Sequence, residues 1–168
     1  GLLDPKRCVQ IGIRGTVHSE DNWAFPRDSG MRVMMIEEVE ERGWRACIEE
    51  GVKVAGDGPV YVSFDIDSLD PAFAPGTGTP EAGGLTMREA QGMGRSLYGL
   101  DIPGADMVEV SPPCDTSGCT ALMGTRVIVD VLGSMVAAGK MGAQKAHIDK
   151  PVTIPHGEFE GRRWSNAP

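Results

Sequence analysis

The fold follows from the stretch Ser63-Phe64-Asp65-Ile66-Asp67-Ser68-Leu69-Asp70-Pro71, in which a run of strand-forming residues ends in carboxylates. Because alternate side chains of a strand point to the same side, we expect Asp65 and Asp67 to face one way and Phe64 and Ile66 the other. Two carboxylates at one strand end repel each other unless a cation or a proton lies between them. The pair therefore predicts a cation site, with a simple turn cap as the alternative.

A long loop follows this stretch. Residues 72–84 contain Pro75, Gly76, Gly78 and Pro80, so proline stiffens the loop and glycine loosens it. Long structured loops of this kind are usually functional. No Lys-Ser/Thr pair follows Gly76, so the loop is not a phosphate-binding loop. Position 69 is leucine, which excludes an EF-hand calcium loop starting at Asp65.

Strands and helices are expected to alternate along the chain. The pattern predicts strands at residues 9–13, 32–35, 60–64 and 105–110, and helices at residues 36–54, 86–100 and 116–138. Residues 16–30 are polar, contain Pro26, and are expected to form a loop. Helices of a dozen residues between strands are typical of parallel βαβ units, so the predicted fold class is α/β with a parallel sheet.

Three chemically active residue types lie at the predicted strand ends, where the sites of parallel sheets are found. Arg14 follows the first strand, Asp65 and Asp67 end the third, and Glu109 lies in the last. Arg14 is interpreted as a salt-bridge partner. Glu109 is either the exposed residue of an edge strand or a carboxylate that holds a cationic ligand, because a buried carboxylate needs a partner.

Composition limits the classes of function. The chain has 168 residues, enough for one domain with a real core, and a net charge of −8, which argues against nucleic acid as a partner. No apolar run is expected to approach the roughly 20 residues needed to cross a membrane, and the N-terminus does not resemble a signal peptide. The four cysteines lack zinc-site spacing and are expected to be free thiols of a cytoplasmic protein.

The last part of the chain breaks the alternating pattern. Residues 141–168 contain prolines and glycines and mix charged with apolar residues without a period. This segment is therefore predicted to be an extended arm or a disordered tail.

Several ordered blocks resemble the ureohydrolase family, which contains arginase, agmatinase and the guanidino-acid hydrolases. The blocks are Val9-Gln10-Ile11-Gly12-Ile13-Arg14-Gly15, Ser63-Phe64-Asp65-Ile66-Asp67 with Asp70-Pro71, Ala74-Pro75-Gly76-Thr77-Gly78-Thr79-Pro80-Glu81, and Val108-Glu109-Val110-Ser111-Pro112-Pro113. They span about residues 1–140, which the resemblance identifies as the C-terminal portion of a ureohydrolase domain.

The resemblance implies a three-layer α/β/α arginase-like fold and two manganese ions, with nickel as the alternative metal. It implies that Asp65 bridges the two ions, that Asp67 binds one of them, and that Glu109 holds the substrate guanidinium group. The implied reaction is hydrolysis of a guanidino compound to urea and an amine by a metal-bridged hydroxide. Homotrimers or homohexamers are implied as the assembly.

The substrate class is narrowed by two segments. Arginases carry acidic residues just after the arginine of the first block, whereas residues 15–18 here contain none. The run from Asp21 to Val33 is similar to hydrolases of guanidinopropionate and guanidinobutyrate. A guanidino-acid hydrolase is therefore expected, with agmatinase as the alternative.

The family's remaining metal ligands and its catalytic histidine are not found among these blocks and are expected before residue 1. No catalytic residue is therefore assigned within this chain. Two hypotheses follow: a ureohydrolase portion that is active when a complementing N-terminal half is supplied, and a truncated, non-catalytic structural subunit. In either case the chain is expected to need a partner or to self-associate, because an incomplete sheet exposes an apolar edge.

Overall fold

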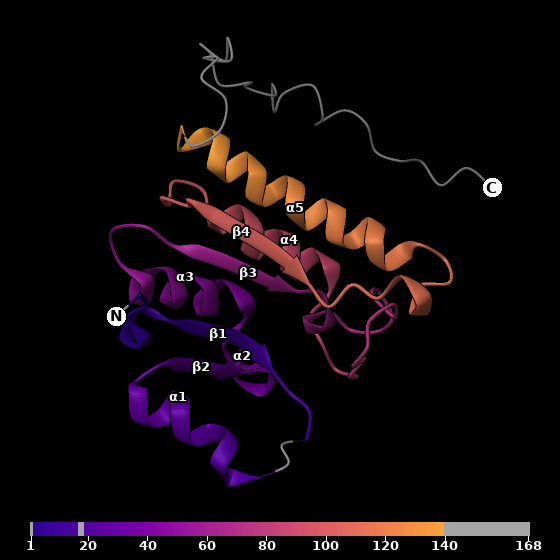
Figure 1. Ribbon diagram of the computed structural model, residues 1–168, viewed down its shortest axis with the longest axis horizontal. Coiled ribbons are helices and arrows are strands. Elements are labelled where there is room, and N and C mark those ends of the chain that lie inside the picture. The colour runs from indigo at the N-terminus through magenta and orange to yellow at the C-terminus, as the bar shows by residue number, and fades with distance from the viewer. Residues whose placement is uncertain (1, 17–18, 140–168) are drawn as a thin grey trace, which may run out of the picture.

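The computed structural model describes residues 2–16 and 19–139 of the chain. The predicted tail, residues 141–168, lies outside the described residues. The described part alternates strands and helices, as Figure 1 shows. The elements are η1 (Pro5–Arg7), β1 (Val9–Ile13), η2 (Glu20–Trp23), α1 (Ala24–Ser29), β2 (Arg32–Met35), α2 (Ile36–Arg42), α3 (Trp44–Ala55), β3 (Tyr61–Asp65), η3 (Ile66–Ser68), α4 (Met87–Ser96), β4 (Gly104–Val108), η4 (Pro112–Cys114) and α5 (Cys119–Ala137).

The strands form two parallel pairs. Strand β1 pairs with β2 from Val9 opposite Arg32 onward, and β3 pairs with β4 from Tyr61 opposite Gly104 to Asp65 opposite Val108. The parallel α/β arrangement predicted from the sequence is confirmed. The single sheet that it suggested is not present among the described residues, where each pair of strands is a separate sheet.

The helices join the two pairs of strands. Helix α3 packs against β1, β2 and α4, and α4 packs against α5, which contacts β4. Beneath them lies one apolar core, whose most completely buried side chains include Met34, Cys47 and Ile66. The core is therefore continuous across the two pairs of strands, although the pairs form two separate sheets.

The predicted helix over residues 36–54 is two helices. Helix α2 ends at Arg42 and α3 begins at Trp44, because Gly43 takes φ 80° and ψ 144°, which no α-helix contains. The predicted loop over residues 16–30 was also wrong in part, since it holds η2 and α1. Pro26 is tolerated in α1 because it lies in the first turn, where its missing N–H has no partner to lose.

The remaining elements agree with their predictions more closely. Helix α4 begins after a capping box, in which Thr86 and Glu89 exchange hydrogen bonds. All four cysteines are free thiols, as predicted. Cys47 lies in the core, and burial raises the pKa of its thiol.

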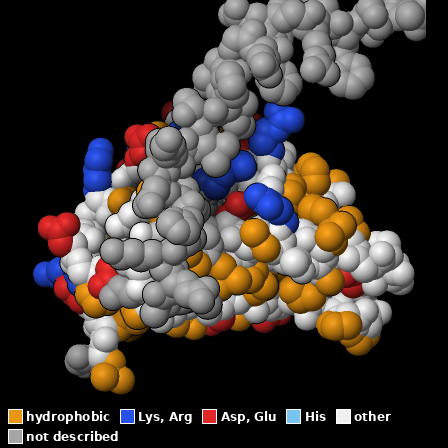
Figure 2. Space-filling view, turned by 90° about the horizontal axis from the view of Figure 1, so that it is seen from above, with side chains coloured by type: hydrophobic (Ala, Val, Ile, Leu, Met, Phe, Trp, Pro, Cys, Tyr) orange, Lys and Arg blue, Asp and Glu red, His pale blue; other side chains and the backbone are white. Residues whose placement is uncertain are grey.

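Helix α5 differs from one prediction. By length and composition alone it is apolar enough to cross a membrane, so the expectation that no such segment exists was wrong. In the structure its inner face, including Gly124, Val127 and Val131, is buried against the protein. Its outer face exposes apolar side chains, and Figure 2 shows such side chains gathered on the face over which α5 runs. These side chains are Leu122, Ile128, Val129, Leu132 and Val136.

Candidate functional site

Asp65 and Asp67 lie at the carboxyl end of β3. The prediction that both lie on one strand was wrong. Asp65 is the last residue of β3, and Asp67 lies in the 3₁₀ turn η3. The backbone N–H of Asp67 donates to Oδ1 of Asp65 over 3.1 Å, so Asp65 caps the turn. Ile66 between them is fully buried and fixes the turn to the core. The two carboxyl groups therefore share one edge of the protein.

The carboxyl group of Asp65 is in an environment that disfavours its charge. Burial, together with the negative charges of Asp67 and Glu109, raises its pKa from 3.8 to about 6, against the opposing effect of the Asp67 backbone N–H. Asp67 in turn accepts a 2.8 Å hydrogen bond from the Thr79 hydroxyl, which links it to the long loop. A cation between these carboxylates would relieve their repulsion.

The sequence suggested that Glu109 lies inside the last strand. In the structure it lies just beyond the end of β4. It takes φ 64°, the left-handed region, and it is the one non-glycine residue of the described chain to do so. Val110 beside it forms a bridge with Thr77 of the long loop. A left-handed glutamate costs of order 1–3 kcal/mol, and such strain is typical of functional sites. Its carboxylate makes no hydrogen bond or ion pair to any described residue, and its charge acts on Asp65.

Among the residues that the structure describes, Arg14 does not find the salt-bridge partner that the sequence suggested. Its guanidinium group instead donates to the backbone carbonyl oxygens of Asp67 over 2.7 Å, of Leu69 over 3.3 Å and of Glu81. A fork of N–H groups is suited to bind several acceptors at once. Arg14 therefore holds the turn after β3 and the end of the long loop together, which positions the site.

Asp70 shapes the same loop. Its carboxylate accepts hydrogen bonds from the backbone N–H groups of Ala72 and Gly83, each over 2.8 Å, and these bonds lower its pKa. Asp115 was missed by the sequence reasoning. It accepts the N–H groups of Thr120 and Ala121 at the start of α5, a role that an aspartate just before a helix could have indicated.

The carboxylates at this edge agree in part with the predicted pair of metal ions. Carboxylate oxygens are ligands that suit manganese and magnesium, so Asp65 and Asp67 fit as part of such a centre. Within residues 2–16 and 19–139, no group of three or more histidine, cysteine, aspartate or glutamate side chains is placed to hold an ion. The described residues by themselves therefore do not complete the predicted metal centre.

The raised pKa of Asp65 predicts how the metal-free chain responds to pH. The folded state holds the proton of Asp65 more tightly than the unfolded chain does. Proton binding at Asp65 therefore stabilises the folded state, fully below pH 3.8, and this stabilisation is lost as pH rises through about 6. Since Asp65 is partly exposed, we expect a loss of only about 1 kcal/mol of unfolding free energy. Thermal unfolding with EDTA between pH 4.5 and 8 measures it. Asp65→Asn should flatten this dependence, and parallel profiles of the two proteins would contradict the assignment.

The comparisons with known proteins agree with this geometry. The model of the arginase family matches residues 1–133. The guanidinopropionase of Pseudomonas aeruginosa is 58% identical over 132 residues, which are 79% of this chain and 42% of that protein. The guanidinobutyrase of the same organism is 47% identical over 131 residues, which are 78% of this chain and 41% of that protein.

A solved structure shares the fold of this chain. The proclavaminate amidino hydrolase of Streptomyces clavuligerus superposes with a TM-score of 0.77 at 42% identity, covering 82% of this chain and 46% of that one. This chain thus spans less than half the length of these relatives, while the match covers most of its own length. The resemblance seen in the sequence is confirmed, and the chain belongs to the arginase family.

Proposed function

We propose that a protein containing this chain hydrolyses a short guanidino acid to urea and an amine, at the carboxyl ends of β3 and β4. The observation that carries this proposal is the convergence of Asp65, Asp67 and Glu109 from two neighbouring strands, with the Asp65 pKa raised by burial and by the charges of the other two carboxylates. Membership of the arginase family supports the reaction class.

In this proposal Asp65 and Asp67 bind a pair of divalent ions, manganese or alternatively nickel. The ions supply an activated water molecule when bound. Thr79 holds one oxygen of Asp67 through its hydroxyl, and outer partners of this kind orient a metal-binding carboxylate. The further ligands come from outside the described residues, from a complementing N-terminal half or a symmetric oligomer.

Glu109 is the residue that orients the substrate. A guanidinium group offers two parallel N–H donors, and a carboxylate is the acceptor that matches them. The backbone at φ 64° turns Glu109 out of the strand direction. Such a pairing would hold the guanidinium carbon close to the carboxylates of Asp65 and Asp67.

The relatives support the proposed substrate class. The 58% identity to a guanidinopropionase favours a guanidino acid over a guanidino amine such as agmatine. Residues 15 and 16 carry no acidic side chain to hold the amino-acid end of arginine. A non-catalytic structural subunit is the second candidate, favoured by the incomplete donor set of the described residues.

Urea release tests this proposal. The chain is co-expressed with the segments of Pseudomonas guanidinopropionase that lie outside the aligned 132 residues, loaded with Mn²⁺, and assayed on 3-guanidinopropionate, 4-guanidinobutyrate and agmatine. We expect kcat/KM for 3-guanidinopropionate to exceed that for agmatine at least about tenfold, and no urea from the chain alone. An assembly that binds metal but releases no urea from any of the three would support the structural subunit instead.

A further inference from the structure

The long loop between η3 and α4 runs across the candidate site, and its alternate residues contact successive parts of that site. Thr77 forms a bridge with Val110, the residue that follows Glu109. Two residues later, the hydroxyl of Thr79 donates to Oδ2 of Asp67 over 2.8 Å. The loop therefore passes from the residue proposed to hold the guanidinium group to a carboxylate proposed to bind metal.

Glu81 is the next alternate residue of this loop, and it lies against the segment that follows β1. Its carbonyl oxygen accepts hydrogen bonds from Nη2 of Arg14 over 2.5 Å and from Nε over 3.2 Å, so its backbone is held in place. A Cβ added to Gly15 would lie 3.4 Å from Oε2 of Glu81 and 3.5 Å from its Cγ. The carboxylate of Glu81 therefore lies where a side chain of residue 15 would begin.

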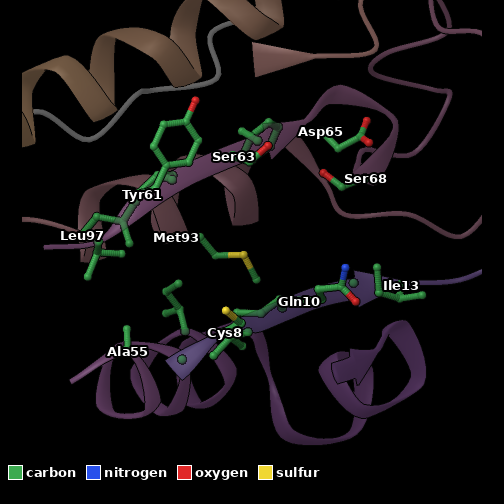
Figure 3. Close-up of a pocket in the computed structure, with 18 of the residues that line it drawn as sticks. Cys8, Gln10, Ile13, Ala55, Tyr61, Ser63, Asp65, Ser68, Met93 and Leu97 are labelled. Carbon is green, nitrogen blue, oxygen red and sulfur yellow. The ribbon is translucent and has the colours of Figure 1, made fainter. Parts of the chain in front are cut away.

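The Glu81 carboxylate carries a charge that no described residue compensates. Glu81 is exposed, and its carboxylate has no hydrogen-bond or ion-pair partner among the described residues. Glu81 and Gly15 line the same cavity of about 1020 Å³ as Asp65 and Asp67. Figure 3 shows Ile13, which ends β1, and Asp65, which ends β3, at the same end of this cavity. A free negative charge is therefore present at the end of the cavity that holds the candidate site.

The spacing along the loop relates Glu81 to the length of a substrate. Two residues of chain span at most about 7 Å, so Glu81 lies within that distance of Thr79 along the loop. In 3-guanidinopropionate two methylene groups separate the guanidino group from the carboxylate, and each further methylene moves the charged end outward by about 1.3 Å. The charged end of a longer substrate therefore comes closer to the Glu81 carboxylate.

We propose that Glu81 is a specificity-determining residue, which selects substrates by the charge at the end far from the guanidino group. Its carboxylate repels the carboxylate of guanidino acids longer than guanidinopropionate and attracts the ammonium group of guanidino amines. The loop supplies this charge beside Gly15, which has no side chain of its own. This inference rests on the proposed function, because it concerns which guanidino compounds the same site prefers.

Glu81→Gln tests the proposal in the assembly of this chain with the guanidinopropionase segments, loaded with Mn²⁺. Glutamine keeps the size of the side chain and the carbonyl oxygen that Arg14 holds, and it removes the charge. We expect kcat/KM to rise about tenfold for 4-guanidinobutyrate, to fall about tenfold for agmatine, and to stay within about twofold for 3-guanidinopropionate. Glu81→Lys should raise the value for 4-guanidinobutyrate further.

Two controls separate the charge of Glu81 from a structural role. Glu40→Gln removes an exposed carboxylate from α2 and should leave all three values within about twofold. In the original assembly, raising NaCl from about 0.05 to about 0.5 M should raise the ratio of kcat/KM for 4-guanidinobutyrate to that for agmatine, because salt screens exposed charges. Glu81→Gln should lose most of this salt dependence, which a structural role would not produce.

The outcomes distinguish this inference from the proposed function. If Glu81→Gln changes all three values by the same factor, or leaves the ratio of 4-guanidinobutyrate to agmatine unchanged, the inference is overturned and the proposed function stands. A ratio that does not respond to salt in the original assembly would also overturn the inference. If the original assembly releases no urea from any of the three compounds, the proposed function fails and the inference fails with it.

Discussion

Replacing Gly76 with alanine is expected to lower the free energy of unfolding by about 3 kcal/mol, because the added methyl group has no space. A Cβ at this position would lie 2.3 Å from Cβ of Asp115 and 2.7 Å from its Cα. No real side chain approaches a backbone atom so closely. The loop of residues 72–84 and the start of α5 would have to separate.

Neither side of this contact can move easily. The N–H of Gly76 donates to the buried hydroxyl of Thr120 over 2.7 Å, and its carbonyl oxygen accepts from the N–H of Ser111 over 2.8 Å. Asp115 is held by the N–H groups of Thr120 and Ala121. Separation would therefore break the buried hydrogen bond from Gly76 to Thr120, and such a bond costs about 1–3 kcal/mol when one partner is left unsatisfied.

Gly78 provides the matched control two residues along the same loop. An added Cβ there meets no atom within 4 Å, and the residue does not take a positive φ. Gly78→Ala should therefore change stability by less than about 0.5 kcal/mol. Urea denaturation of both variants beside the original chain measures the difference. Equal midpoints for Gly76→Ala and the original chain would show that the loop is not packed on α5.

The strands were the most predictable part of the fold. Residues 9–13 and 32–35 form β1 and β2 as expected, because short apolar runs between turn signals leave few alternatives. The break at Gly43 could not be predicted, since a glycine in a helical pattern does not by itself reveal its backbone angles. The separation of the strands into two pairs could not be predicted, because pairing between distant segments depends on what lies between them.

Within the site, residue types were predicted better than their roles. Asp65 and Asp67 were identified from their place after a strand, and the structure does place them at one edge. Arg14 was taken for an ion-pair partner because a charge suggests an opposite charge, but it binds backbone carbonyl groups, which leave no pattern in side-chain identities. The left-handed backbone of Glu109 contradicts the preference of glutamate and could not be predicted from it.

Glu109→Gln is expected to lower kcat/KM of the complemented assembly for its guanidino substrate about 1000-fold. A carboxylate can form two charge-assisted hydrogen bonds to a guanidinium group, each worth about 1.5–3 kcal/mol, and the neutral amide of glutamine offers one acceptor without the charge. Glutamine has nearly the same shape and keeps the left-handed backbone, so the loss would reflect the charge and not the fold.

Two further measurements separate this role from others. Asp106→Asn, on the exposed part of β4, removes a carboxylate that accepts a hydrogen bond from Tyr61 and should leave kcat/KM within about twofold. Metal content, measured by elemental analysis, should stay the same in Glu109→Gln, because Asp65 and Asp67 hold the ions in this proposal. A loss of metal together with activity would assign Glu109 to the metal centre, and full activity of the variant would exclude it from the guanidinium site.

Since φ 64° is strained for glutamate, Glu109→Gly should also raise the stability of the metal-free chain while abolishing activity, as expected where strain is retained for function.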